Sequence, residues 1–208
     1  MRKRFILTAA LPFALIAGAG TLAAQSAPSL PGVADTGRVT SGTYAPDAGH
    51  TLIGWKVDHF GFNDYFGQFG NATGTLVLNK ENPGASTVDI TIPVDSLSTV
   101  SAGLNRHMAT ADFLDAANHP TARFVSRHVM VNGNQATIHG ELTLRGVTRP
   151  VTLEARFVGA GTNPMNRKET VGFHATASIK RSEFGMTYAV PMVSDNVDLT
   201  ISVAFEKQ

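Results

Sequence analysis

The chain has no cysteine among its 208 residues. This absence excludes disulfide staples, catalysis by a thiol and attachment of a lipid through a cysteine. A stable fold therefore has to come from buried apolar surface. An excess of one charge is missing too, since 17 basic residues stand against 16 acidic ones. Because Lys and Arg are not clustered, nothing indicates a nucleic-acid partner.

Long hydrophobic runs are also missing, apart from one apolar stretch over residues 5–17. It follows three basic residues at positions 2–4 and precedes small residues that end in Ala23 and Ala24, a pattern typical of an export signal. The stretch is too short for a membrane span of about 20 residues, and no comparable run follows. We therefore predict a signal peptide over residues 1–24 and no transmembrane span in the mature chain.

Residues 25–42 are rich in Ser, Pro, Gly, Ala and Thr without a periodic apolar pattern, which predicts a flexible leader. The remaining residues, 43–208, are predicted to form one domain. Its dominant pattern is alternation of apolar and polar residues, the period of a strand with one buried face. This alternation predicts eight strands, over residues 51–60, 70–78, 88–92, 124–131, 138–144, 151–157, 171–179 and 197–205.

Short turns connect several of these strands. The sequences Asn82-Pro83-Gly84, Asn132-Gly133-Asn134 and Arg145-Gly146-Val147 supply residues that tolerate positive φ or fix a tight bend. Short links imply antiparallel neighbours, and closure of such a sheet hides one apolar face and removes both edges. The predicted fold is all-β, an eight-stranded antiparallel barrel. Segment 94–120 lacks alternation and contains a helix-like run over residues 104–114, so it is predicted to form a short helical or irregular cap.

Several inward positions of the predicted strands carry small side chains. Such positions leave space in a barrel unless neighbouring side chains fill it to the usual density of about 0.74. We therefore predict an open apolar lumen that holds a ligand, and the alternative is a barrel filled by its own side chains. The small inward residues are Ala72, Gly74, Gly140, Ala155, Ala175 and Ala177.

Motifs for catalysis are absent from the sequence, which has neither a G-x-S-x-G elbow nor a phosphate-binding loop after a strand. His107, Asp112, Asp115 and His119 lie close together, so one alternative is a metal or acid–base site. The interpretation we favour is structural, with Asp112 and Asp115 capping helix ends and His107 bonding loop carbonyls. No catalytic residue, metal ligand or cofactor is predicted.

Two features near the first predicted strand leave alternatives open. His59 continues the inward row of Trp55 and Val57, so it either contacts the head group of a ligand or has a structural role. Five aromatic residues follow within residues 60–69. They form either ordinary core under a loop or a cluster that lines the barrel mouth.

Several short motifs follow one another in a specific order and spacing. The first motif is a strand that ends in a histidine, followed by a glycine, an aromatic residue and G-x-F. The central part of the chain carries short elements similar to H-L, S-x-D-F-F-D, Y-P and F-x-S. A G-x-L-T-x-x-G-x-T hairpin and an I-x-R-x-x-F-G segment follow. These motifs lie at residues 51–62, 67–69, 106–108, 111–115, 119–120, 124–126, 140–148 and 179–186. In their order and spacing they resemble the YceI-like family.

This resemblance implies a lipocalin-like barrel exported to the periplasm, with a lumen that binds a polyisoprenoid or similar long-chain lipid. It implies no catalytic residue, and it allows for a homodimer. The chain departs from the family pattern at Met108, Leu114 and His119. These residues lie in the predicted cap, so the departures put in doubt which head group or chain is accepted.

The predicted function is to bind and carry or store a long apolar ligand in the periplasm. One alternative is a sequestering or stress-protective protein for miscellaneous hydrophobic compounds, and a second is a metal-dependent enzyme. For the head group the candidates are His59, Arg106 and His107. The full set of residues predicted to line the lumen and its mouth is Ile53, Trp55, Val57, His59, Phe66, Phe69, Leu76, Ile90, Arg106, His107, Phe113, Phe124, Leu142, Leu153, Phe173, Ala175, Phe184 and Met186.

Overall fold

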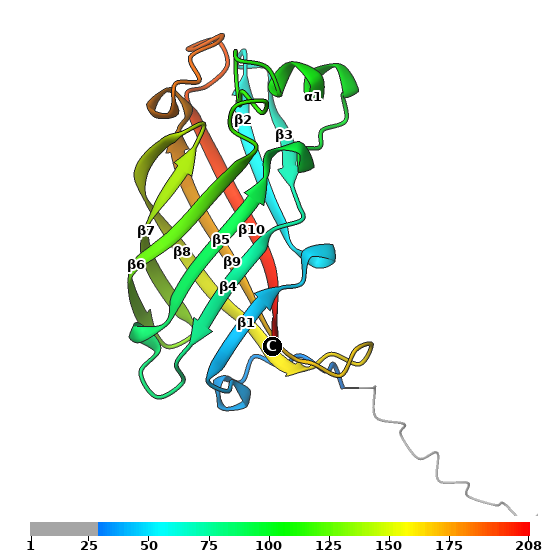
Figure 1. The fold of residues 1–208 in the computed structure, drawn as a ribbon, viewed down its shortest axis with the longest axis vertical. Coiled ribbons are helices and arrows are strands. Elements are labelled where there is room, and N and C mark those ends of the chain that lie inside the picture. The colour runs from blue at the N-terminus through cyan, green and yellow to red at the C-terminus, as the bar shows by residue number, and fades with distance from the viewer. Residues whose placement is uncertain (1–28) are drawn as a thin grey trace, which may run out of the picture.

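A computed structural model of the chain describes residues 29–208, so the predicted signal peptide, residues 1–24, lies outside the described residues. Ten β-strands form a single sheet in which every pairing is antiparallel (Figure 1). The strands are β1 (Gly42–Pro46), β2 (Leu52–His59), β3 (Asn63–Phe69), β4 (Thr73–Leu78), β5 (Thr87–Pro93), β6 (Thr121–Asn132), β7 (Gln135–Leu144), β8 (Val147–Thr162), β9 (Glu169–Lys180) and β10 (Asn196–Lys207).

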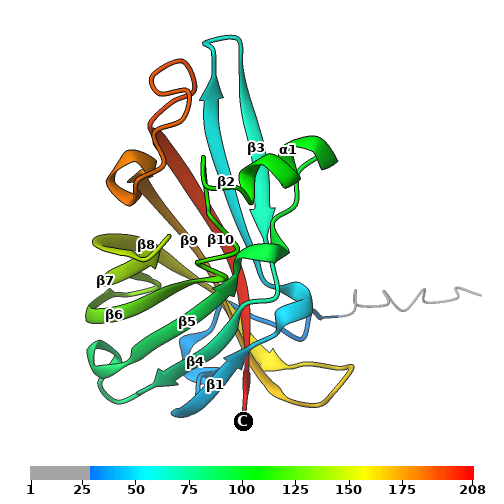
Figure 2. The ribbon, with the colours of Figure 1, turned by 45° about the horizontal axis from the view of Figure 1, so that its top comes forward.

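The sheet closes into a barrel because β10 pairs with β1, with Tyr44 opposite Lys207. The closed ring follows the order β1, β4, β5, β6, β7, β8, β9 and β10. Strands β2 and β3 continue beyond β1 and β4 as a hairpin that pairs with β10 and rises above the ring (Figure 2). The prediction of an all-β, eight-stranded antiparallel barrel is therefore confirmed.

Two of the ten strands have no counterpart among the predicted ones. The first, β1, is only five residues long and ends in a proline, but its Tyr44 is fully buried. The second, β3, carries the exposed Phe66 among polar residues, so its apolar and polar residues do not separate cleanly onto two faces. Residues 60–69 thus form the turn and second strand of a hairpin.

Segment 94–120 covers one end of the barrel, as the cap prediction requires. It begins with a 3-10 turn (Val94–Ser96) and contains the helix α1 (Ala102–Met108). Helix α1 ends at Met108, so the prediction of a helix-like run that extends to residue 114 was wrong. Ser101 caps its first turn through a hydrogen bond from Leu104 N to Ser101 Oγ, and after Met108 the chain folds into turns.

Two hydrophobic clusters divide the interior. The cap cluster fills the barrel end under segment 94–120 and consists of Val94, Leu114, Phe124, Leu142, Val151, Ile179, Phe184 and Met186. The lower cluster lies toward the other end and consists of Val39, Tyr44, Leu76, Phe157, Ala160, Val171 and Phe205. Several apolar residues between the two clusters are only partly buried although they face inward, as expected where a wall borders empty space.

Residues 31–41, which the sequence assigns to the leader, lie against the lower end of the barrel. Val33 forms an isolated bridge with Ala160 in β8, and a 3-10 turn (Thr36–Arg38) follows. Val39 is buried in the lower cluster. No helix within residues 29–208 is long and apolar enough to cross a membrane.

Candidate ligand-binding cavity

A cavity of about 520 Å³ runs inside the barrel. All eight strands of the closed ring contribute to its wall, mainly through Leu, Ile, Val and Phe side chains. The polar residues that line it are few, and Lys80 is the one charged residue among the lining residues of the described chain. The cavity therefore offers an apolar environment with a polar margin.

Small side chains create part of this space, as the sequence predicts. Ala155 and Ala175 lie opposite each other in β8 and β9, and both border the cavity together with Ala72. The other three small positions do not: Gly140 is filled by the ring of Phe124, Ala177 packs against the cap cluster, and a Cβ at Gly74 would lie 2.1 Å from the carbonyl oxygen of Asp89 in β5. The lumen is thus open in its middle and packed toward the cap.

The cap end of the cavity is closed by buried side chains. Phe124, Leu142 and Val151 belong both to the cavity wall and to the cap cluster, and each is less than a tenth exposed. Beyond them, Phe184 and Met186 fill the barrel end. A ligand in the cavity would therefore end against the ring of Phe124 and its neighbours.

The opposite end carries the polar lining residues. Three short segments contribute there: the turn at residues 36–38, the β4–β5 connection and the β6–β7 turn. Their lining residues, among them Lys80, Pro83 and Asn134, are exposed at the surface. This end, called the mouth below, is where the cavity meets solvent.

Eight of the predicted ligand-binding residues lie in the cavity wall: Ile53, Leu76, Ile90, Phe124, Leu142, Leu153, Phe173 and Ala175. The other ten do not line it; they come from the β2–β3 hairpin beyond Ile53, from segment 94–120 and from the turn after β9. Those residues are Trp55, Val57, His59, Phe66, Phe69, Arg106, His107, Phe113, Phe184 and Met186.

The three head-group candidates lie at the cap end, away from the mouth. His107 Nε2 is 2.8 Å from Asp112 Oδ2, and its ring packs edge-on against Phe113 and Tyr188. His59 pairs with Val193 at the base of the hairpin turn, and Arg106 is exposed on α1. The structure does not bring these three residues to the cavity.

Sequence reasoning missed the mouth. Thr36 and Gly37 belong to the predicted leader, Lys80 and Asn134 lie in turns without any periodic pattern, and Gln135 is the first residue of β7. Wall residues such as Ile138, Leu199 and Val203 were also left out of the predicted set, although Ile138 shares an alternating row with Leu142 and the other two lie on the last alternating row. The alternation could have identified the wall residues, but no comparable signal marks the mouth.

Comparison with known proteins places this barrel in a family. The family model described as "YceI-like domain" matches residues 44–205. The chain belongs to the YceI-like family. It is 38% identical over 154 residues to the protein YceI of Escherichia coli O157:H7, covering 74% of this chain and 80% of that protein. It is 36% identical over 170 residues to YceI of Salmonella arizonae, with 81% and 88% covered.

Two solved structures show the same fold as this chain. The crystal structure of BcnA from Burkholderia cenocepacia matches with a TM-score of 0.69 at 22% identity, covering 76% of this chain and 98% of that chain. A polyisoprenoid binding domain from Saccharophagus degradans, implicated in plant cell wall breakdown, matches with a TM-score of 0.61 at 13% identity, covering 79% and 98%. At these identities the likeness establishes the fold.

The four His and Asp residues that the sequence offers as a metal or acid–base site in this YceI-like chain fall into two separate pairs. His107 pairs with Asp112, while His119 Nε2 lies 3.9 Å from Asp115 Oδ2. Within residues 29–208, no three His, Cys, Asp or Glu side chains are grouped closely enough to hold a metal ion.

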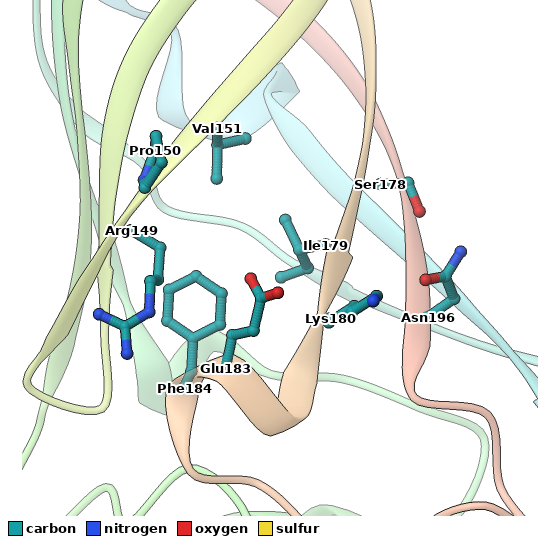
Figure 3. Close-up of a pocket in the computed structure, with 9 residues that line it drawn as sticks. All are labelled: Arg149, Pro150, Val151, Ser178, Ile179, Lys180, Glu183, Phe184 and Asn196. Carbon is teal, nitrogen blue, oxygen red and sulfur yellow. The ribbon is translucent and has the colours of Figure 1, made fainter.

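A second, smaller pocket of about 380 Å³ lies on the barrel wall (Figure 3). The pairing of β8 with β9 ends at Glu154 and Thr176, so the two strands separate toward the cap. Phe184 comes from the turn after β9, and in Figure 3 its ring lies between Arg149 and Glu183. Since Phe184 is 1% exposed, it packs the opening from inside, and Arg149, Ser178, Lys180, Glu183 and Asn196 supply the polar part of the pocket lining.

Proposed function

We propose that this YceI-like chain binds a long apolar molecule, a polyisoprenoid or similar lipid, inside the barrel, and carries or stores it in the periplasm. The observation that carries the proposal is the 520 Å³ cavity, whose wall is apolar from the closed end to the mouth. The match to a solved domain described as polyisoprenoid binding supports the same ligand class.

The driving force is transfer of apolar surface out of water. Each buried methylene contributes about 0.8 kcal/mol, which corresponds to about a fourfold gain in affinity per carbon. Because the wall offers few polar partners, affinity should rise with chain length until the chain reaches Phe124 at the closed end. The head group then remains at the mouth, near Lys80, instead of near the three candidates at the cap.

The test introduces a large side chain into the middle of the lumen. Ala175 is buried in β9 and borders the cavity, whereas the next residue, Thr176, is exposed on the outer face. Ala175→Phe should weaken binding of a long-chain prenyl alcohol at least about tenfold, because the ring takes the space of the chain. Thr176→Phe should leave binding unchanged.

Unfolding by denaturant separates blocked binding from damage to the fold. The added ring fills existing space, so Ala175→Phe should retain the unfolding free energy of the unligated parent chain. Native mass spectrometry of the chain purified from periplasm should also detect a copurifying lipid. Absence of any bound lipid, together with no binding of added prenyl lipids, would sink the proposal.

The remaining functional alternatives are distinguished by selectivity. A sequestering protein should bind unrelated dyes and lipids with similar affinity, while a carrier should prefer one chain length and head group. A metal-dependent enzyme would need His107 and His119, so their alanine variants and a metal analysis test that idea. The N-terminal sequence of the mature chain tests whether the chain is exported. Sedimentation tests whether it forms the expected homodimer.

A further inference from the structure

The segment that precedes the first strand crosses the mouth of the cavity. Residues 31–41, here called the strap, are fixed at two places on the barrel rim and, close to β1, also through Thr40, which bonds Tyr44, Glu169 and Lys207. At one side Val33 and Ala160 of β8 exchange two backbone hydrogen bonds of 3.1 and 2.9 Å. At the other side Lys80, which follows β4, donates from Nζ to the Gly37 carbonyl at 2.9 Å and from its backbone N–H to Ser41 Oγ at 2.9 Å.

Between its two attachments the strap forms part of the cavity wall. Thr36, Gly37 and Val39 all line the cavity, and Val39 is buried in the lower cluster. Figure 1 shows this blue segment at the lower end of the barrel, beside the start of β1. Lifting the strap would therefore widen the mouth and leave the strands of the barrel in place.

The rim of β8 is shaped to receive the strap. A Cβ atom at Gly161 would lie 2.0 Å from the carbonyl oxygen of Pro31, and one at Gly159 would lie 3.1 Å from Val33 N. Any side chain at residue 161 would thus collide with the strap backbone. Two glycines at the contact indicate a fitted docking site on the barrel.

The attachments of residues 31–38 are few enough to open, while Thr40 keeps the base of the strap on the barrel. The bridge at Val33 is a single residue pair, in contrast to the eight to eleven pairs that join the long strands β8, β9 and β10. Val33 is 38% exposed, and the second attachment depends on an exposed lysine. Segments held in this way open locally at low cost in free energy, long before the barrel unfolds.

We propose that the strap is a lid that controls entry and release of the ligand at the mouth. This inference rests on the proposed function, since it concerns the same cavity. The strap lies before residues 44–205, the part that matches the family, so the family match does not cover it. The lid retains a long apolar chain inside the barrel and releases it when the Val33 bridge and the Lys80 contact break.

An engineered disulfide tests the lid in the exported full chain. Because the chain has no cysteine, Val33→Cys with Ala160→Cys creates one defined pair. Paired residues that exchange both hydrogen bonds have Cα atoms about 5.5 Å apart, a distance that a disulfide spans. A naturally fluorescent polyene fatty acid serves as the probe, and stopped-flow fluorescence measures its release. Release should slow at least about tenfold in the oxidised variant and recover after reduction.

Two glycine-to-alanine variants test the opposite change, in which the strap is displaced from the barrel rim. Gly161→Ala should displace the strap and speed release several-fold, whereas Gly172→Ala is a matched control because its nearest contact would be an ordinary 3.7 Å. Equal release rates in the oxidised, reduced and Gly161→Ala proteins would overturn the lid while leaving the binding function intact. If the parent chain binds no probe and no prenyl lipid, the binding function itself is wrong.

Discussion

The ring of Phe124 occupies the space that a side chain at residue 140 would need, since a Cβ on Gly140 would lie 2.4 Å from Phe124 Cζ. The two residues belong to the adjacent strands β6 and β7. This contact closes the cavity below the cap, so Phe124 sets the depth to which a ligand can enter.

Shortening Phe124 should deepen the cavity. Phe124→Ala removes the ring from the closed end, so the chain length of highest affinity should increase by several carbons. The same change should lower the unfolding free energy by about 3 kcal/mol, the lower end for a buried phenylalanine, because the ring already borders empty space. A displacement series with prenyl alcohols of rising length measures the shift. Phe66→Ala, at a site 63% exposed, should change neither quantity.

The reverse change at Gly140 should overpack the same contact. A methyl group there would approach the Phe124 ring and also lie 2.6 Å from the carbonyl oxygen of Val125, which cannot move freely within β6. We expect Gly140→Ala to lower the unfolding free energy by about 1–3 kcal/mol. Denaturant titration checks this, and Gly140→Ala combined with Phe124→Leu should recover part of the loss. No recovery would show that the backbone contact dominates.

Arg181 organises the loop that follows β9 at the cap end. Arg181 is 4% exposed, and its guanidinium donates to the carbonyl oxygens of Ser194, Met186, Tyr188 and Val193 at 2.8–3.2 Å. Burial lowers the pKa of Arg181, and the nearby charge of Asp195 opposes this shift. One side chain thus supplies partners for four carbonyls that would otherwise lack them.

Replacing Arg181 should loosen this loop. Arg181→Met leaves the four carbonyls without their donor, so the unfolding free energy should fall by about 2–4 kcal/mol. Arg181→Lys should restore only a part, because an ammonium group cannot reproduce the planar set of donors. Hydrogen exchange of residues 185–195 should accelerate in both variants. Full stability in Arg181→Met would contradict the role assigned to the guanidinium.

The alternation of apolar and polar residues was sufficient to predict the barrel. In β8 and β9, for example, Ala155 and Ala175 fall on buried rows whose outer neighbours are exposed, so both the strands and the inner face could be read from the sequence. The hairpin strand β3 was missed because Phe66 is exposed there, which blurs the pattern.

The site was predicted less completely than the fold, for a physical reason. Wall residues such as Leu76 and Ile90 belong to strands with a clear period, whereas the mouth is built from turns and from residues 36–39. The sequence assigned the mouth to the cap end, near His107, because nothing in it reveals at which end side chains fill the barrel. Only packing in three dimensions places Phe184 and Leu114 under the cap and leaves the other end open.

The carboxylate of Asp195 makes the stability of the loop that follows β9 depend on pH. Its carboxylate accepts hydrogen bonds from Ser182 N at 2.8 Å and from Ser182 Oγ at 2.7 Å. Burial alone would raise the pKa of Asp195, but the Ser182 bonds, helped by the charge of Arg181, outweigh it, so the pKa of Asp195 is lowered. The ionised form is therefore favoured in the folded chain.

This lowered pKa predicts the pH range in which the chain loses stability. The contribution of Asp195 is fully present above the ordinary carboxyl pKa of about 4 and disappears as the pH falls through the lower value of the folded chain. Asp195→Asn should cost about 1 kcal/mol of unfolding free energy near neutral pH, and the difference should shrink by about pH 3. Denaturant titrations at several pH values measure it, with Asp198→Asn as an exposed control on β10. A deficit of equal size at every pH would mean that shape, and not charge, links Asp195 to Ser182.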